Sequence, residues 1–346
     1  MEQKAVASAT VRPQETITLN NSMKIPVVGL GTYKSDKKQV QHAISDAIDA
    51  GYRHFDCAWL YGNEDEVGQA LHSKIDGGLV QREDLFITSK LWNNFHEKSK
   101  VIPMLEESLG SLGLHYVDLY LINWPFGFKE NAPLCPTNHP EKSYSNVDYL
   151  ETWEGMENCV KQGLAKSIGV SNFNPQQITR LLDHCKIKPV VNQVEVTPNL
   201  NQKDLIKFCK EHEIVVTGYA PLGRSAHHGT SGGPTPTMLD PKVIQIGEKY
   251  KKSAAQVVLN YLVIICYRLF VSQSAIVGFF GDLCGPKVCA QVAHLRKYQH
   301  FRLYFGARGR RLLGFAQQEP ESCYHERVFL APTLQFLIVN QVRPYC

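Results

Sequence analysis

From Ile25 to Val263, short apolar runs alternate with stretches in which apolar residues recur every three or four positions. The longer period is that of an amphipathic helix, and a short apolar run indicates a buried strand. Strands that alternate with helices are typical of a parallel sheet covered by helices. We therefore predict seven strands, within residues 27–33, 53–61, 85–92, 117–125, 165–172, 189–196 and 214–223.

The interval between the first two strands carries a complete helix signal. Val40, Ile44 and Ile48 recur at helical spacing, Asp36 precedes them as a candidate N-cap, and Gly51 follows them. Asp is a preferred N-cap residue, and Gly commonly follows the last turn of a helix. We predict a helix between these two residues.

Residues 15–28 differ from the alternating series. They hold two short strand-like runs on either side of Asn20 and Asn21. Asn favours the tight turns that connect antiparallel strands. The segment therefore predicts a β-hairpin, which would lie apart from the parallel sheet as a lid over one of its ends.

Polar side chains gather where the predicted strands end. In a barrel of parallel strands the carboxyl ends meet on one face, and active sites are built there. The residues concerned are Asp56, Tyr61, Lys90, Asn123, Ser171, Asn172, Gln193, Glu195 and Tyr219. We predict that this face carries the functional site.

The C-terminal quarter of the chain departs from the pattern. Lys outnumbers Arg 22 to 5 before Ile264, whereas Arg outnumbers Lys eight to two from Ile264 onward. No clear alternation of strands and helices continues there. We predict a barrel domain over residues 15–263 and an atypical basic segment over residues 264–346, for which disorder is one alternative.

The composition excludes a disordered chain and indicates the compartment. Of 346 residues, 43% are hydrophobic and 20% are charged, which is enough apolar surface for a large core. The ten cysteines form no CxxC pair, and the N-terminus has no signal-peptide pattern. We read the cysteines as free thiols and expect a cytosolic protein.

Other candidate sites in the chain are weak. Residues 262–281 are apolar, but Arg268 and a Ser-Gln-Ser interruption speak against a membrane span. The Arg cluster at 307–311 lacks the aromatic residues of a nucleic-acid module, so we expect a solvated stretch. Neither His227-His228 nor the pair of Cys284 and Cys289 has metal-site spacing, so we predict no metal.

The predicted barrel would bring Asp56, Tyr61 and Lys90 together at one rim. A tyrosine hydroxyl ordinarily has a pKa of about 10, and a neighbouring ammonium favours the phenolate and so lowers that pKa. Asp56 would hold Lys90 charged and in place. Such a tyrosine could protonate an alkoxide that forms from a carbonyl group. Taken singly, each residue has a structural alternative, such as a carboxylate or lysine that only ends a strand.

Seven stretches of the sequence together carry a family resemblance. They are "GLGTY", "FDCAWLYGNEDEVGQAL", "ITSKLWN", "VDLYLINWP", "GLAKSIGVSNF", "VVNQVEVTP" and "GYAPLG". In this order they resemble the aldo-keto reductases, in their aldose-reductase-like branch, over roughly residues 15–263. The resemblance implies an α/β fold, a (β/α)8 TIM barrel that binds NADPH in an extended form and reduces aldehydes and ketones by hydride transfer. "GLGT" is not the GxGxxG of a Rossmann fold, which agrees with this.

By this resemblance Tyr61 matches the family's proton donor, Lys90 the residue that lowers its pKa, and Asp56 the carboxylate paired with that lysine. The fourth member is ordinarily His, and here it is Asn123. An amide can still donate an N–H to a substrate carbonyl oxygen, so orientation could survive the exchange. An alternative is that Asn123 only braces the end of its strand.

The resemblance also implies cofactor and substrate contacts. The implied cofactor residues are Gly31, Thr32, Tyr33, Asp56, Ser171, Asn172, Gln193, Tyr219 and Leu222. The implied substrate walls are Tyr33, Trp59, Trp92, Asn123, Trp124 and Phe126. The loop over residues 125–147, with four prolines, matches a substrate-covering loop. The expected partner is a small carbonyl compound, without nucleic acid or membrane, and the expected state is a monomer.

The resemblance ends near Val263. The family's motif that holds the 2′-phosphate of NADPH has no counterpart in "IICYRLFVSQSAIVGFF", and the family's eighth strand is not evident there, although "SAIVGFF" could add a strand. We therefore expect an eighth strand that is atypical or missing, and the choice between NADPH and NADH rests on resemblance alone. The alternative function is an impaired or inactive relative that has lost its affinity for the cofactor.

Overall fold

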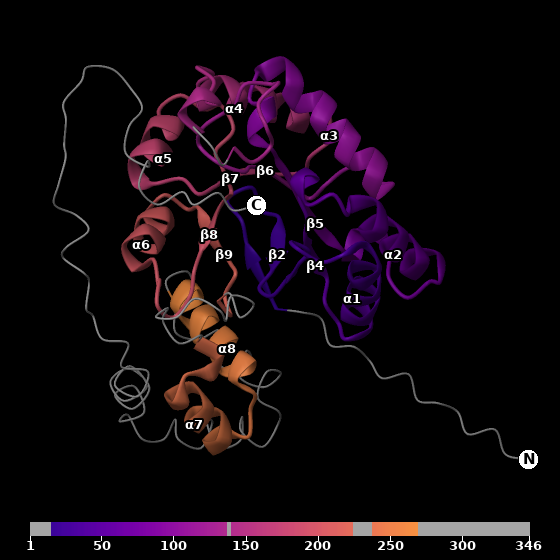
Figure 1. The fold of residues 1–346 in the computed structure, drawn as a ribbon, viewed down its shortest axis with the longest axis vertical. Coiled ribbons are helices and arrows are strands. Elements are labelled where there is room, and N and C mark those ends of the chain that lie inside the picture. The colour runs from indigo at the N-terminus through magenta and orange to yellow at the C-terminus, as the bar shows by residue number, and fades with distance from the viewer. Residues whose placement is uncertain (1–14, 137–139, 224–236, 269–346) are drawn as a thin grey trace, which may run out of the picture.

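The computed structural model describes residues 15–136, 140–223 and 237–268, and Figure 1 shows their arrangement. Seven parallel strands curl into a nearly closed barrel in the order of the sequence. The strands are β3 (Leu30–Gly31), β4 (His54–Asp56), β5 (Phe86–Leu91), β6 (Leu119–Ile122), β7 (Ile168–Ser171), β8 (Val191–Glu195) and β9 (Val215–Tyr219). Each lies within one of the seven predicted runs, so this prediction is confirmed.

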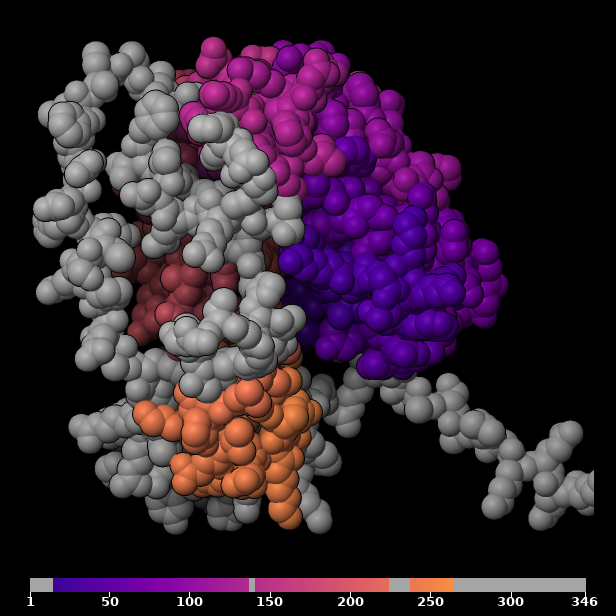
Figure 2. All heavy atoms as spheres, in the orientation of Figure 1, coloured from indigo at the N-terminus to yellow at the C-terminus, as the bar shows by residue number. Residues whose placement is uncertain are grey.

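The helices lie outside the strands, as in a (β/α)8 barrel (Figure 1). They are α1 (Lys37–Asp49), α2 (Glu64–Asp76), α3 (Lys98–Leu112), α4 (Tyr149–Lys161), α5 (Pro175–Leu182), α6 (Lys203–Glu211), α7 (Pro241–Tyr250) and α8 (Ala254–Arg268). Short 3₁₀ helices complete the loops: η1 (Trp59–Tyr61), η2 (Arg82–Asp84), η3 (Asn93–Phe95), η4 (Pro140–Lys142) and η5 (Thr237–Leu239). In the space-filling view of Figure 2, α7 and α8 form the orange part that extends from the barrel.

The predicted helix signals are present in the structure. The carboxylate of Asp36 accepts a hydrogen bond of 2.9 Å from the backbone N–H of Gln39 and caps α1. Val40, Ile44 and Ile48 are all buried on the inner face of that helix. These three apolar residues hold α1 on the barrel, because helices in proteins are stabilised mainly by burial of one face.

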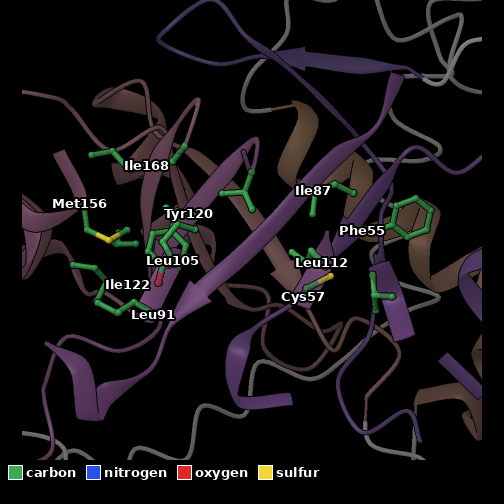
Figure 3. Packing of buried hydrophobic residues seen from close by; sticks show 14 of the residues in the cluster. Phe55, Cys57, Ile87, Leu91, Leu105, Leu112, Tyr120, Ile122, Met156 and Ile168 are labelled. Carbon is green, nitrogen blue, oxygen red and sulfur yellow. The ribbon is translucent and has the colours of Figure 1, made fainter. Parts of the chain in front are cut away.

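The core lies between the strands and the surrounding helices. Figure 3 shows Ile87, Tyr120 and Ile168 of three neighbouring strands together with Leu105 of α3 and Met156 of α4. All five belong to one cluster of buried residues. This core fixes where each strand ends, and therefore where the polar residues at the strand ends lie.

The predicted hairpin is confirmed. Strand β1 (Thr16–Thr18) pairs antiparallel with β2 (Lys24–Pro26), with Ile17 opposite Ile25. Leu19 and Ile25 pack in a second cluster with residues at the start of four barrel strands, Phe86, Leu119, Val190, Val191 and Val215. The hairpin therefore covers the amino-terminal end of the barrel, opposite the carboxyl ends of the strands.

The described part of the chain does not close the barrel between its first and last strands. Among the described residues, β3 pairs only with β4 and β9 only with β8, so no strand lies between them. All residues of β5 are buried, whereas the last three residues of β9 are half-buried. The expectation of an atypical or missing eighth strand concerns residues after Val263, most of which lie outside the described residues, so it stays a prediction. The division at residue 264 stays a prediction, because residues 269–346 lie outside the described residues.

Several other predictions can be compared with the structure only where they fall on described residues. No helix within the described ranges is long and apolar enough to cross a membrane. Most of the 262–281 stretch, the Arg cluster at 307–311 and the two candidate metal pairs lie outside the described residues.

The thiols of Cys57, Cys159, Cys185 and Cys209 are free. Cys135 is disulfide-bonded, so the prediction that all cysteines are free thiols is wrong at this position.

His96 is a buried histidine without a hydrogen-bond partner for either ring nitrogen among the described residues. Its side chain lies just after η3, and the residue is only 1% exposed. Burial lowers the pKa of His96 to about 3. The unfolded chain therefore binds a proton at this residue near pH 6.5, where the folded protein does not, so acid favours unfolding.

We expect His96→Leu to lose less stability than the wild type on acidification. Stability from the depressed pKa is present above about pH 6.5 and falls as the pH is lowered toward the folded pKa. Between pH 7.5 and pH 5 the variant should gain about 2 kcal/mol relative to the wild type. Urea unfolding at both pH values measures this. His42→Leu, at an exposed position of α1, is the control, and an equal pH response of all three proteins would contradict the expectation.

Candidate functional site

Lys90 of β5 is the centre of the polar cluster at the carboxyl ends of the strands. The residue is 1% exposed, and its ammonium donates three hydrogen bonds. They go to Asp56 Oδ2 at 2.7 Å, the carbonyl oxygen of Cys57 at 2.8 Å and the hydroxyl of Tyr61 at 3.2 Å. The structure therefore brings together the three residues that the sequence predicted to meet.

Asp56 ends β4 and lies between two donors. Its Oδ2 receives the hydrogen bond from Lys90, and its Oδ1 accepts one of 2.8 Å from Gln193 Nε2 of β8. Strands β4 and β8 are separated by three other strands in the sheet, so the Gln193 bond crosses the interior of the barrel. Both oxygens of the carboxylate are thus fixed from opposite walls.

Tyr61 is placed by the turn that follows β4. It ends η1, and Gly62 after it takes a left-handed conformation with φ of 64°, which suits glycine. The Tyr61 ring is half-buried and lies 5.0 Å, between ring centroids, from the ring of Tyr33. Tyr33 is 40% exposed, so the pair lies at the solvent-exposed edge of the face formed by the carboxyl ends of the strands.

The net pKa of Tyr61 differs from the sequence-based expectation. Burial raises the pKa of the Tyr61 hydroxyl, and the positive charge of Lys90 lowers it, but the balance lies above the ordinary value. Lys90 therefore stabilises the buried Tyr61 phenolate, but by less than burial destabilises it. The consequence is that Tyr61 is a protonated phenol at neutral pH and is available as a proton donor.

Lys90 keeps its charge in spite of burial. Burial alone lowers the pKa of Lys90, but attraction to Asp56 and Tyr61, with their hydrogen bonds, raises it above its ordinary value. A lysine without these partners would lose its proton on burial. Asp56 is thus the group that keeps a positive charge beside the Tyr61 hydroxyl, as predicted.

Asn123 follows β6 and is held by its backbone. Its N–H donates to the carbonyl oxygen of Leu91 at 3.2 Å, and its carbonyl oxygen accepts a hydrogen bond of 2.9 Å from Asn172 Nδ2. Tyr219 in turn donates from its hydroxyl to Asn172 Oδ1 at 2.9 Å. Within the described chain the side-chain amide of Asn123 has no hydrogen bond, so its N–H groups are available on this face.

Several predicted cofactor residues lie in this hydrogen-bond network. Ser171 donates from its hydroxyl to the carbonyl oxygen of Gln193 at 2.8 Å, and Thr32 donates to the carbonyl oxygen of Asp56 at 3.1 Å. Asn172 has a φ of 63°, a left-handed conformation that is uncommon outside glycine and frequent at functional sites. Gly31 has open space where a side chain would begin, and Leu222 is half-buried.

The predicted substrate aromatics fall into separate places. The rings of Trp124 and Phe126 lie 5.8 Å apart, between centroids, in the loop after β6. Trp92 is 6% exposed and donates from its indole N–H to the carbonyl oxygen of Leu134 at 3.0 Å. Trp59 donates to Glu107 Oε1 at 2.7 Å, on the side of α3. The substrate roles of these residues stay predictions.

Two roles within the site were not predicted from the sequence. The bond between Gln193 and Asp56 joins residues that are 137 positions apart, and no local pattern indicates it. The carbonyl oxygen of Cys57 is the third acceptor of the Lys90 ammonium, and a backbone group carries no sequence signal. Only the order of strands in a barrel could have suggested that β4 and β8 face each other.

Three comparisons with known proteins give the same result. The model of the aldo/keto reductase family matches residues 27–277. Aldo-keto reductase AKR2E4 of Bombyx mori is 45% identical over 253 residues, which cover 71% of this chain and 79% of that protein. Aldo-keto reductase family 1 member A1 of Xenopus tropicalis is 46% identical over 251 residues, which cover 71% of this chain and 76% of that protein.

A solved structure is also similar. The crystal structure of Bombyx mori AKR2E4 in complex with NADP superimposes with a TM-score of 0.67 at 43% sequence identity. The superposition covers 73% of this chain and 81% of that chain. In each of these three alignments, at least 76% of the relative's own chain is covered.

We expect Asp56→Asn to destabilise the protein by about 3–5 kcal/mol, because it leaves the buried Lys90 ammonium without its anion. Urea unfolding at pH 7 measures this loss. The matched control is Asp49→Asn, which breaks the more exposed pair with Lys74 and should cost at most about 1 kcal/mol. Equal effects of the two substitutions would show that the Lys90 charge does not depend on Asp56.

Proposed function

Since the chain belongs to the aldo/keto reductase family, we propose that it reduces aldehydes or ketones to alcohols with NADPH, and that Tyr61 donates the proton. The observation that supports this most is the hydrogen-bonded chain from Asp56 through Lys90 to Tyr61 at the carboxyl ends of the strands. It joins a protonated phenol to a buried, permanently charged ammonium. A polar C=O bond that gains a hydride needs such a proton donor.

The residues around the cluster fit the nicotinamide end of the cofactor. Ser171, Asn172 and Gln193 present side chains with both donors and acceptors at the ends of two adjacent strands. Gly31 leaves open space, and Tyr219 provides an aromatic ring beside Asn172. When bound, NADPH supplies the hydride. Residues that would hold its 2′-phosphate are not among those described.

Protonation by Tyr61 follows from its contacts. The hydroxyl gives its proton to the carbonyl oxygen as negative charge develops there, and the resulting phenolate is stabilised by the Lys90 ammonium 3.2 Å away. Asp56 keeps that ammonium charged throughout. The bond that breaks is the O–H of Tyr61, and the bond that forms is the O–H of the product alcohol.

Asn123 would orient the carbonyl group. Its amide can donate one N–H to the substrate oxygen, and it cannot serve as a second proton donor. Loss of one oxyanion-stabilising donor typically costs about 10²–10³ in rate, and an amide retains part of that effect. We therefore propose a slower reductase than one with imidazole at this position. Tyr33, Trp124 and Phe126 would form apolar walls for the substrate.

A second candidate is an impaired or inactive member of the family. It is supported by the lack of a strand between β3 and β9 within the described ranges, because closure of a barrel normally removes unpaired strand edges. On this alternative the scaffold over residues 15–263 remains and cofactor affinity is lost through the divergent segment 264–346. Under either function we propose a cytosolic monomer, and under the reductase function its partner is a small carbonyl compound.

Titration with NADPH separates the two candidates. We expect quenching of tryptophan fluorescence at micromolar NADPH, and Tyr61→Phe should leave this binding intact while it lowers carbonyl reduction by at least about 10²-fold. The loss of rate follows because phenylalanine has no proton to give. Absence of quenching in the wild type would favour the inactive candidate. Unchanged turnover of Tyr61→Phe would show that another group is the acid.

Replacement of the amide tests the role of position 123. We expect Asn123→His to raise kcat by about 10-fold or more, because a neutral imidazole donates a stronger and better aligned hydrogen bond to the developing oxyanion. Steady-state rates with one aldehyde and one ketone measure this. Asn123→Ala is the matched control and should be slower than the wild type. If all three proteins had the same kcat, Asn123 would only brace its strand.

A further inference from the structure

A second buried carboxyl group lies on the outer side of β5, away from the open face. Glu64 is the first residue of α2 and is 4% exposed. Its Oε1 accepts a hydrogen bond of 2.7 Å from the hydroxyl of Ser89, which is fully buried in β5. Ser89 directly precedes Lys90, and adjacent residues of a strand point to opposite faces. Glu64 and Asp56 therefore hold the same short piece of β5 from its two sides.

The chain between Tyr61 and Glu64 is short and fixed. Gly62 turns it with a left-handed φ of 64°, and Asn63 follows with only 2% exposure. Asn63 Nδ2 donates to the carbonyl oxygens of Thr32 at 3.0 Å and Ser35 at 3.1 Å, which anchors this segment to the loop after β3. Glu64 then anchors it to β5. Within three residues after Tyr61, the chain is thus hydrogen-bonded to the loop after β3 and to strand β5.

We propose that Glu64 is a positioning residue for the proton-donating pair, and that its hydrogen bond with Ser89 sets the separation between the Tyr61 hydroxyl and the Lys90 ammonium. The bond joins the residue three positions after Tyr61 to the residue immediately before Lys90. It therefore closes a ring whose other link is the 3.2 Å contact between Lys90 and Tyr61. Loss of the bond leaves the start of α2 free to move relative to β5. The proposal rests on the reductase function proposed above for its effect on rate.

The surroundings of Glu64 indicate that its hydrogen bond matters more than its charge. Burial raises the pKa of Glu64 to about 7, while the hydroxyls of Ser89 and Ser108 and the charge of Lys90 act in the opposite direction. The carboxyl is therefore partly protonated at neutral pH. The other titratable groups near it are Asp65 on its own helix, Cys57 after β4 and Tyr120 of β6.

Two buried hydroxyls near Glu64 lie outside hydrogen-bond geometry with any described residue, although one of them, Ser108, is close enough to lower the Glu64 pKa. They belong to Ser108 of α3 and Tyr120 of β6. An amide in place of the carboxyl would keep an oxygen for the Ser89 hydroxyl and would offer N–H groups to these two acceptors. Glu64→Gln is thus a conservative variant that preserves the link, whereas Glu64→Ala and Ser89→Ala remove it from either end.

The test compares these three variants by the titration of Tyr61 and by kinetics. The Tyr61 resonance in protein labelled with [¹³Cζ]tyrosine is assigned by its absence in Tyr61→Phe, and its pKa is read from the shift with pH. We expect the pKa to rise in Ser89→Ala and Glu64→Ala, because Tyr61 moves away from Lys90. We expect kcat to fall about 10-fold to 10²-fold with KM changed less than about threefold. Glu64→Gln should retain at least about one third of kcat and the wild-type titration.

The controls separate the possible failures. Asp65→Asn removes an exposed carboxylate from the same turn of α2 and should change neither readout. Circular dichroism and NADPH titration establish that each variant is folded and binds cofactor, and Ser89→Ala remains informative if Glu64→Ala does not fold. The proposal would be overturned if Ser89→Ala had the same Tyr61 pKa and the same kcat as the wild type. It would also be overturned if the kcat of Glu64→Gln were as low as that of Glu64→Ala. If the wild type itself reduced no carbonyl compound, the proposed function would fail, while the NMR titration would still decide the role of Glu64.

Discussion

The site depends on one constraint, which is that a lysine ammonium lies almost completely out of contact with water. A buried cation is tolerated only when anions and carbonyl dipoles surround it. Asp56, the Cys57 carbonyl and the Tyr61 hydroxyl supply that surrounding, and each comes from the end of β4 or the turn after it. The need to keep Lys90 charged therefore fixes the geometry of the groups proposed to do the chemistry. The proposed proton donor, Tyr61, is thus one of the groups that surround this cation.

Much of the architecture could be predicted because local sequence patterns carry it. All seven strands arise from short apolar runs, and the Asp36 cap and the hairpin turn at Asn20 and Asn21 are signals within a few residues. The meeting of Asp56, Tyr61 and Lys90 followed from one further rule, that parallel strands present their carboxyl ends on a common face. These features needed no knowledge of distant contacts.

The remaining features depend on contacts between distant segments or on a balance of opposed effects. The contact between Gln193 and Asp56 exists only because a curled sheet brings β8 across from β4. The direction of the Tyr61 pKa was wrong because the sequence shows the lysine but not the depth of burial, and burial is the larger effect. The contacts of Asn63 and Glu64 were also missed, since both residues resemble ordinary helix-start residues until their partners are known. Whether the barrel closes depends on residues beyond those described.

The bond across the barrel has a consequence for how ligand binding and acidity are connected. Gln193 belongs to the group of residues proposed to hold the nicotinamide, and it also restrains one oxygen of Asp56. A ligand that took the N–H now donated to Asp56 would remove a donor from that carboxylate and leave more of its negative charge for Lys90, whereas a ligand that used the second N–H or Oε1 of Gln193 would leave the bond in place. In the first case, binding at β8 would change the electrostatics at the end of β4 on the opposite wall of the barrel. Binding of such a ligand and the electrostatic balance between Asp56 and Lys90 would then be coupled through one amide group.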